Sequence, residues 1–137
     1  MTALQADLRW EGGTVLSCRS GEVQAALDWD SRTAASPVQA LVFALAGCMA
    51  SDVVLVLEKG RQPLRGLLAR VSAERAANPP RRLLRVDIRF TVTGEVPADK
   101  VERAIRLSRE TYCSVWHSMA QDIELTTTFE VEPAPAA

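Results

Sequence analysis

The three cysteines are the residues of this chain best suited to nucleophilic or redox chemistry. Cys18, Cys48 and Cys113 form neither an even set nor a Cys-x-x-Cys pair, so they predict no disulfide framework. A thiolate with a second cysteine in reach can reduce a peroxide, because it attacks the O–O bond, becomes a sulfenic acid and condenses with its partner to a disulfide. Cys48 and Cys113 are the candidates for such a pair if the fold brings them within disulfide distance.

Cys48 lies near the middle of an apolar segment that we expect to form one long helix. Ser36 and Pro37 provide an N-cap and a proline at the first helical position, and Gly60 ends the helix. Only three side chains between residues 38 and 57 are clearly polar, and these are Gln39, Ser51 and Asp52. The helix is therefore apolar around nearly its whole circumference, which requires extensive burial.

The burial of this helix has two possible sources. A membrane span is disfavoured, since Asp52 near the centre would cost roughly 2.5 to 3.5 kcal/mol to insert. A chain of 137 residues can cover one face of the helix but hardly all of them. We therefore expect a homodimer in which a second copy packs against this helix at or near the two-fold axis.

Cys113 lies on a second expected helix, 65 positions after Cys48. Asp99 and Glu102 form a start that resembles a capping box, and the helix runs to about His117. Its inward face is predicted from residues at helical spacing, which are Val101, Ile105, Ser108, Tyr112, Trp116 and Met119. Crossed or antiparallel packing of the two helices would be needed to join the thiols.

Short segments with alternating apolar side chains surround the two helices. In chain order they are residues 8–10, 14–18, 23–29, 63–76, 83–93 and 123–131. This order predicts an α+β fold, βββ-α-ββ-α-β, with an antiparallel sheet and a long buried central helix. We expect residues 1–137 to form a single domain, with a frayed tail at about 132–137.

Composition excludes several functional classes. A formal charge of -1, from 16 basic and 17 acidic residues, provides no attraction to nucleic acid or to anionic membranes. The seven glycines form no phosphate-binding loop, and a single histidine without a serine elbow is poor material for a hydrolase. The N-terminal segment MTALQADLRW has no signal-peptide pattern, so we expect a cytoplasmic protein with reduced thiols.

Two segments carry a resemblance to a known family. SPVQALVFALAGCMASDVVLVLEKGR and LSRETYCSV resemble the two cysteine-bearing helices of the OsmC/Ohr family of thiol-dependent hydroperoxide reductases, and the likeness extends from Trp10 to Val131. It implies an intertwined homodimer with its active site at the interface, organic hydroperoxides as substrates and an external dithiol as reductant, with no cofactor. It also implies that Cys48 is the peroxidatic thiol and Cys113 the resolving thiol.

The sequence departs from the family at the groups that activate the first thiol. The best-understood peroxidases of the family carry a glutamate ten residues before the first cysteine, and this glutamate holds an arginine over the thiolate. Val38 stands at that position here, followed by Gln39. Arg19 and Arg32 are both candidates for the arginine, and we include Arg19 in the predicted site. The missing carboxylate predicts weaker activation of Cys48.

A zinc site is an alternative from another class of function. Cys113 and His117 stand at i and i+4 on one helix, and together with Cys18 and Cys48 they would make a Cys3His set. Such sites normally draw two ligands from one tight turn, which this sequence lacks.

A third alternative keeps the fold and the dimer but has no catalytic activity. The protein would bind a small apolar ligand in a groove lined by Trp10, Trp29 and Trp116. In that case both thiols would remain reduced in the presence of limiting peroxide.

Overall fold

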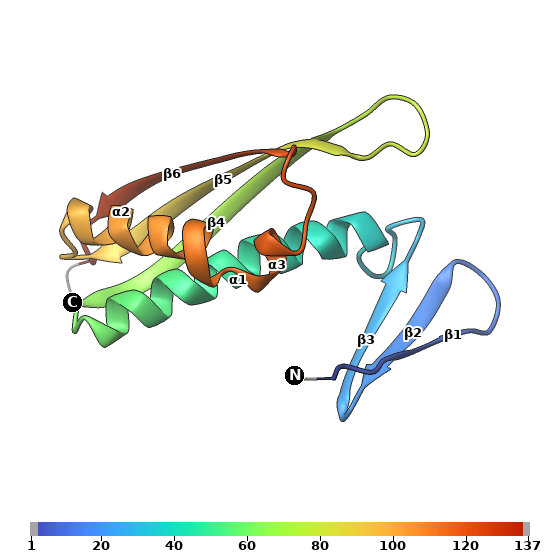
Figure 1. Ribbon diagram of the computed structural model, residues 1–137. Helices are drawn as coiled ribbons and strands as arrows, with labels where there is room; N and C mark the ends of the chain where they lie inside the picture. Colours follow the sequence, from blue (N-terminus) through green and yellow to red (C-terminus); the bar gives the residue numbers. More distant parts are fainter. Residues whose placement is uncertain (1–2, 136–137) are drawn as a thin grey trace. The chain divides into compact units, whose positions relative to one another are not determined.

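The computed structural model describes residues 3–135, which contain six strands and two main helical segments (Figure 1). The chain divides into two compact units, of which the first ends at Phe43 and the second begins at Ala44. Helix α1 (Pro37–Lys59) begins in the first unit and continues into the second.

The first unit is a three-stranded antiparallel meander followed by a loop and the start of α1. Its strands are β1 (Asp7–Trp10), β2 (Val15–Ser20) and β3 (Val23–Asp28), in the order β1-β2-β3. Ser36 caps α1, because its hydroxyl accepts a hydrogen bond from the Gln39 N–H at 3.2 Å. The Gln39 side chain accepts one from the Ser36 N–H at 2.9 Å, which completes a capping box.

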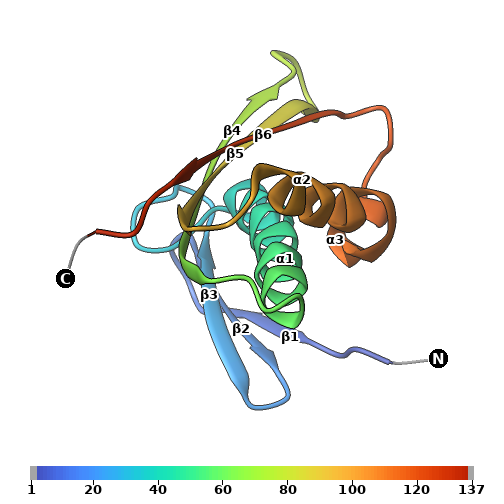
Figure 2. The same ribbon diagram turned by 90° about the vertical axis from the view of Figure 1, so that its left-hand side faces the viewer.

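The second unit contains a three-stranded sheet and a helical crossover. Its strands are β4 (Leu64–Arg75), β5 (Leu83–Gly94) and β6 (Glu124–Glu132), in the order β4-β5-β6. The crossover between β5 and β6 consists of α2 (Ala98–Leu107), the π-helical turn η1 (Ser108–Tyr112) and the short helix α3 (Ser114–His117). The second half of α1 and the crossover lie on the same face of this sheet, as Figures 1 and 2 both show.

The core of the second unit lies between the sheet and α1. Leu45, Met49, Val53 and Leu57 recur every four residues along α1, and each is at most 2% exposed. The facing residues of β5 alternate along the strand, and they are Val86, Ile88, Phe90 and Val92. These two rows fix the rotation of α1 and therefore the direction in which its remaining side chains point.

The expected α+β class and element order are confirmed, with differences in detail. Strands β4 and β5 form the expected antiparallel hairpin, whereas β6 pairs with β5 in parallel. The expectation of a wholly antiparallel sheet was therefore wrong for β6, because the helical crossover returns the chain in the same direction as β5. Helix α1 is buried on one face within this chain, and Leu55 on another face is 63% exposed.

The ends of the later elements also differ from the sequence prediction. Helix α2 has Pro97 as its N-cap and no side-chain cap, so the expected capping box at Asp99 and Glu102 is not formed. Strand β6 ends at Glu132, and residues 133–135 have no regular structure. The rest of the predicted tail, 136–137, lies outside the described residues.

Candidate active site

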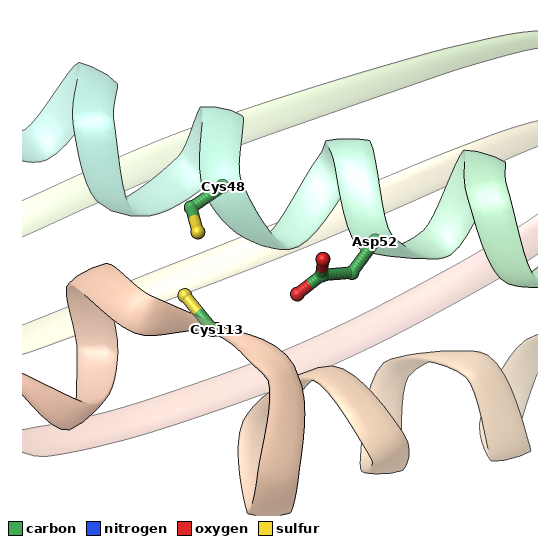
Figure 3. Close-up of side chains that lie close together, drawn as sticks. All are labelled: Cys48, Asp52 and Cys113. Carbon is green, nitrogen blue, oxygen red and sulfur yellow. The ribbon is translucent and has the colours of Figure 1, made fainter. Parts of the chain in front are cut away.

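Cys48, Asp52 and Cys113 form a cluster in the second unit (Figure 3). The two Sγ atoms and a carboxylate oxygen of Asp52 all lie within 4.8 Å of one another. Cys48 and Asp52 are one turn apart on α1, and Cys113 lies between η1 and α3. The fold therefore brings together the two thiols that the sequence selected, although they are far apart along the chain.

The π-helical turn η1 places Cys113 toward α1. The Cys113 N–H donates to the Ser108 carbonyl oxygen at 2.8 Å, five residues back rather than four. The extra residue moves the buried face forward by one position, so that Cys113 is fully buried and Tyr112 is 54% exposed. The expectation that Tyr112 lies on the inward face was therefore wrong, and one continuous helix to His117 is not formed.

Cys113 acts as the N-cap of α3. Its Sγ accepts a hydrogen bond from the Trp116 N–H at 3.3 Å. Burial raises the pKa of the Cys113 thiol to about 11, and although the Trp116 N–H opposes this change, Cys48 and the charge of Asp52 reinforce it. At neutral pH Cys113 is therefore a protonated thiol.

Cys48 has a more open environment than Cys113. Its side chain is half-buried, and the neighbouring Gly47 and Ser51 on α1 are exposed. A Cβ atom added at Gly47 would have no atom within 4 Å, so this side of the helix is open within the chain. Ser51 is bonded to its own helix, since its hydroxyl donates to the Gly47 carbonyl oxygen at 2.7 Å. A small reactant can therefore approach Cys48 more easily than Cys113.

Asp52 is held by a serine from the crossover. The Ser108 hydroxyl, which is fully buried, donates to Asp52 Oδ2 at 2.8 Å. No salt bridge involves Asp52 within residues 3–135. The sequence signal for Ser108 was a small polar residue on the otherwise apolar face of the predicted helix.

His117 of the proposed zinc site does not join the cluster. His117 is exposed, since Cys113 turns inward as the cap of α3 and the histidine turns away. In the described part of the chain, the one group of three or more close metal-ligand side chains consists of Cys48, Asp52 and Cys113. The Cys3His prediction was therefore wrong. Two thiols and a carboxylate are donor types that zinc accepts, but one carboxylate oxygen is already bonded to Ser108.

Two other predicted site residues lie on β2 of the first unit. Cys18 is half-buried and Arg19 exposed, and both line an open hollow of about 600 Å³ on the first sheet. The role of Arg19 stays a prediction. The tryptophan groove proposed from the sequence has a weaker basis, because Trp116 is only 6% exposed and belongs to the core of the second unit.

The loop that carries Arg32 is organised by a buried carboxylate. Asp28 accepts hydrogen bonds from the hydroxyls of Thr14 and Thr33 and from the backbone N–H groups of Asp30, Arg32 and Thr33. These hydrogen bonds hold the pKa of the Asp28 carboxyl well below its usual range, and the bond from Thr14 has the largest effect. The Arg32 side chain is 77% exposed and lies 3.9 Å from the Asp30 carboxylate.

Gln39 does not replace the glutamate that is absent at Val38. Its side-chain oxygen already accepts hydrogen bonds from the Ser31 hydroxyl and the Ser36 N–H. The amide is also neutral, so it provides no charge to hold an arginine. The departure from the family pattern noted in the sequence therefore persists in the structure.

The chain has an α+β fold in which two cysteines from separate helical segments lie close together. The chain belongs to the family described as OsmC-like protein, which matches residues 28–128. It is 36% identical to Protein YhfA of Escherichia coli (strain K12) over 134 residues, which are 96% of this chain and 100% of that protein. The family resemblance inferred from the sequence is confirmed.

Solved structures share the fold. A hypothetical protein from Aquifex aeolicus VF5 matches with a TM-score of 0.90 at 21% identity, covering 98% of this chain and 100% of that one. An organic hydroperoxide resistance protein OsmC from Legionella pneumophila matches with a TM-score of 0.71 at 16% identity, covering 96% of this chain and 98% of that one. The organic hydroperoxide resistance protein OhrB of Bacillus subtilis matches with a TM-score of 0.62 at 12% identity, covering 94% of this chain and 98% of that one. At these identities the likeness concerns the fold alone.

Proposed function

We propose that this protein is a cytoplasmic, homodimeric thiol peroxidase that reduces organic hydroperoxides. The observation that carries the proposal is the pair of sulfur atoms, Cys48 Sγ and Cys113 Sγ, within 4.8 Å of each other. One thiol is half-buried and the other is fully buried, as expected for a peroxidatic and a resolving cysteine. Membership of the OsmC-like family supports a peroxidase-type role.

The reaction has three steps, and the third uses an external reductant. The Cys48 thiolate attacks the distal oxygen of the hydroperoxide, the O–O bond breaks, and the alkoxide takes a proton to leave as an alcohol. Cys113 sulfur then attacks the Cys48 sulfenic acid, which forms the disulfide and releases water. An external dithiol reduces the disulfide by thiol–disulfide exchange and is itself oxidised.

The different surroundings of the two thiols support this assignment of roles. Cys48 is the thiol that a substrate can approach, and its helix is apolar on both sides of the cluster. Cys113 is buried, and its raised pKa makes it a poor first nucleophile. Apolar surroundings favour an organic tail on the peroxide, because the tail can be buried when the substrate binds.

Exposed apolar side chains support a homodimer. On α1, Phe43 is 65% and Leu55 is 63% exposed, and on the first sheet Trp10 is 61% exposed. A soluble monomer seldom leaves so many large apolar side chains in water. We therefore propose that a second copy of the chain buries them. The intertwined arrangement would also allow the copy to contribute groups to the Cys48 site.

Activation of Cys48 needs a positive charge, and the proposal leaves that role to Arg19 or Arg32. Neither has the glutamate anchor of the family, because Val38 occupies that position. We therefore expect a slow first step compared with enzymes that hold the arginine in place. An Arg19→Ala variant and an Arg32→Ala variant would show which guanidinium contributes, through a further loss in the rate of peroxide reduction.

The assignment of roles is tested by serine substitutions at the three cysteines. Cys48→Ser should abolish the consumption of cumene hydroperoxide in the presence of a dithiol. Cys113→Ser should complete a single turnover and retain a sulfenic acid, which dimedone traps and mass spectrometry locates at Cys48. Cys18→Ser is the matched control, because it removes a thiol outside the cluster and should leave the rate unchanged.

Two outcomes would contradict the proposal. Full activity in Cys48→Ser would show that another group attacks the peroxide. The unmodified protein could also form no disulfide after limiting peroxide and keep both thiols titratable. That result would favour a dimer that binds an apolar ligand without turnover.

A further inference from the structure

We infer that Asp52, oriented by Ser108, is the proton relay of the resolving step, taking the proton from the Cys113 thiol and delivering it to the oxygen that leaves Cys48. The inference deepens the proposed function and rests on it. It assigns a role to the acidic side chain that lies beside both thiols.

The geometry places the carboxylate beside both sulfur atoms (Figure 3). An oxygen of Asp52 lies within 4.8 Å of both sulfur atoms, and Figure 3 shows its carboxylate directed toward Cys113 from the turn after Cys48. Ser108 occupies Oδ2 at 2.8 Å, whereas within residues 3–135 no hydrogen bond reaches Oδ1. One oxygen is therefore anchored, and the other remains free to exchange a proton.

The resolving step needs such a group. Burial raises the pKa of Cys113 to about 11, so this thiol carries its proton at neutral pH, when it should attack. The groups that act on it are Cys48 and Asp52 from α1 and the Trp116 N–H from α3, and none of these is a cationic side chain. A nearby base is the remaining means of removing the proton as the disulfide forms.

The relay balances without an added reactant. The Cys113 S–H bond breaks as its sulfur attacks Cys48 sulfur, and the S–O bond of the sulfenic acid breaks. The proton passes from Cys113 Sγ to Asp52 and from Asp52 to the departing hydroxyl, which leaves as water. Asp52 ends as a carboxylate, and the products are the Cys48–Cys113 disulfide and one water molecule.

The carboxylate should affect the second chemical step and not the first. The first step, the attack of Cys48 on the peroxide, makes no use of Asp52. After the sulfenic acid has formed, the carboxylate assists the second step as a base. A residue with a purely structural role would not separate the two rates in this way.

The experiment compares Asp52→Asn with Glu58→Gln in the otherwise complete protein. Asparagine keeps the shape and the Ser108 hydrogen bond but accepts no proton at physiological pH. Glu58 is exposed on the same helix, six residues or about 9 Å further along, so its variant removes an equal charge without touching the cluster. Rapid mixing with cumene hydroperoxide, followed by dimedone or acid quench, measures sulfenic acid and disulfide separately.

In Asp52→Asn we expect disulfide formation to slow by about 100-fold, the lower end of the range for a positioned acid–base group. Sulfenic acid should form at least as fast as in the unmodified protein and then accumulate. The rate of disulfide formation in this variant should rise steeply with pH as the Cys113 thiolate forms, whereas the unmodified protein should show a shallower rise. Glu58→Gln should behave like the unmodified protein in both steps.

Ser108→Ala provides a second, weaker test of the same relay. It keeps the Asp52 carboxylate but removes the hydrogen bond that orients it, so we expect a smaller slowing of the resolving step than in Asp52→Asn. Circular dichroism and the thermal midpoint report whether either variant has lost its fold.

The outcomes separate the relay from the proposed function. The role of Asp52 would be overturned if a folded Asp52→Asn variant formed the disulfide at an unchanged rate, or if both steps slowed equally. Either result would leave the roles of the two cysteines as proposed. Absence of sulfenic acid and disulfide in the unmodified protein would instead refute the peroxidase itself.

Discussion

The two units of this chain reach order by different means. In the second unit, the side chains of α1 and β5 form a dry apolar layer, with Phe90 and Met49 fully buried. In the first unit, Asp28 is the one buried side chain among residues 3–43, and large apolar residues such as Val23 are mostly exposed. The second unit has a core of its own, whereas the first has a polar network and an uncovered sheet.

This difference bears on where chemistry can be placed. A thiol pair needs fixed sulfur positions, and a close-packed core fixes them because it leaves side chains few alternative rotamers. Cys48 and Cys113 both lie in the unit that has such a core. The first sheet instead carries apolar surface that a partner would cover, which fits the proposed role of a second copy.

The largest expected effect is in the core of the second unit. Phe90→Ala should lower the free energy of unfolding by about 3–5 kcal/mol, because it removes a fully buried aromatic ring and leaves a cavity. Val23→Ala in the first sheet, where the side chain is 70% exposed, should change the free energy of unfolding by less than about 0.5 kcal/mol. Chemical denaturation measures both, and equal losses would break the comparison.

A second prediction concerns the uncovered sheet. Trp10 is 61% exposed, and its indole N–H donates to the Gly13 carbonyl oxygen at 3.0 Å. If a second copy buries this ring, Trp10→Ala should raise the dimer dissociation constant about 30-fold, the value for a loss of about 2 kcal/mol at an interface. Sedimentation over a concentration series measures it. An unchanged constant would show that the first sheet does not contribute to association.

A third prediction concerns the polar network of the first unit. The pKa of Asp28 is held below its usual value, so its carboxylate stabilises the loop at neutral pH, and this contribution is lost as the pH falls below about 4. Asp28→Asn should speed hydrogen exchange at the Asp30, Arg32 and Thr33 amides and remove that pH dependence. Amides of β5 in the second unit serve as the internal reference and should not change.

The smallest expected effect is at a surface ion pair of the second unit. Arg106 and Glu102 lie one turn apart on α2, with an N–O distance of 2.6 Å and both side chains about half exposed. Arg106→Ala should cost no more than about 0.5 kcal/mol in thermal or chemical unfolding. A loss comparable to that of Phe90→Ala would show that the core is not what stabilises this unit.

Much of the fold followed from local patterns, and the exceptions have identifiable causes. The long helix around Cys48 was predictable because a capping serine, a proline and a continuous apolar run agree. The second helix was predicted in one piece, but a π-helical turn at Ser108 shifts the register by one residue. Periodicity assumes a constant number of residues per turn, so it assigned the buried position to Tyr112 and left out Cys113.

Part of the candidate site was likewise predictable from the sequence, and part was not. Two cysteines on expected helices, and the resemblance of these two segments to a family, were sufficient to select Cys48 and Cys113. The hydrogen bond from Ser108 to Asp52 joins residues 56 positions apart, and no local pattern encodes such a contact.

By itself, the sequence determined the order of the elements and which thiols could react, because helix caps and hydrophobic periodicity act over a few neighbouring residues. The tertiary structure decided which residue of the π-helical turn faces α1, that β6 runs parallel to β5, and that a serine holds the carboxylate beside both sulfurs. Each of these depends on how distant segments pack around one core, where a shift of a single residue exchanges a buried side chain for an exposed one.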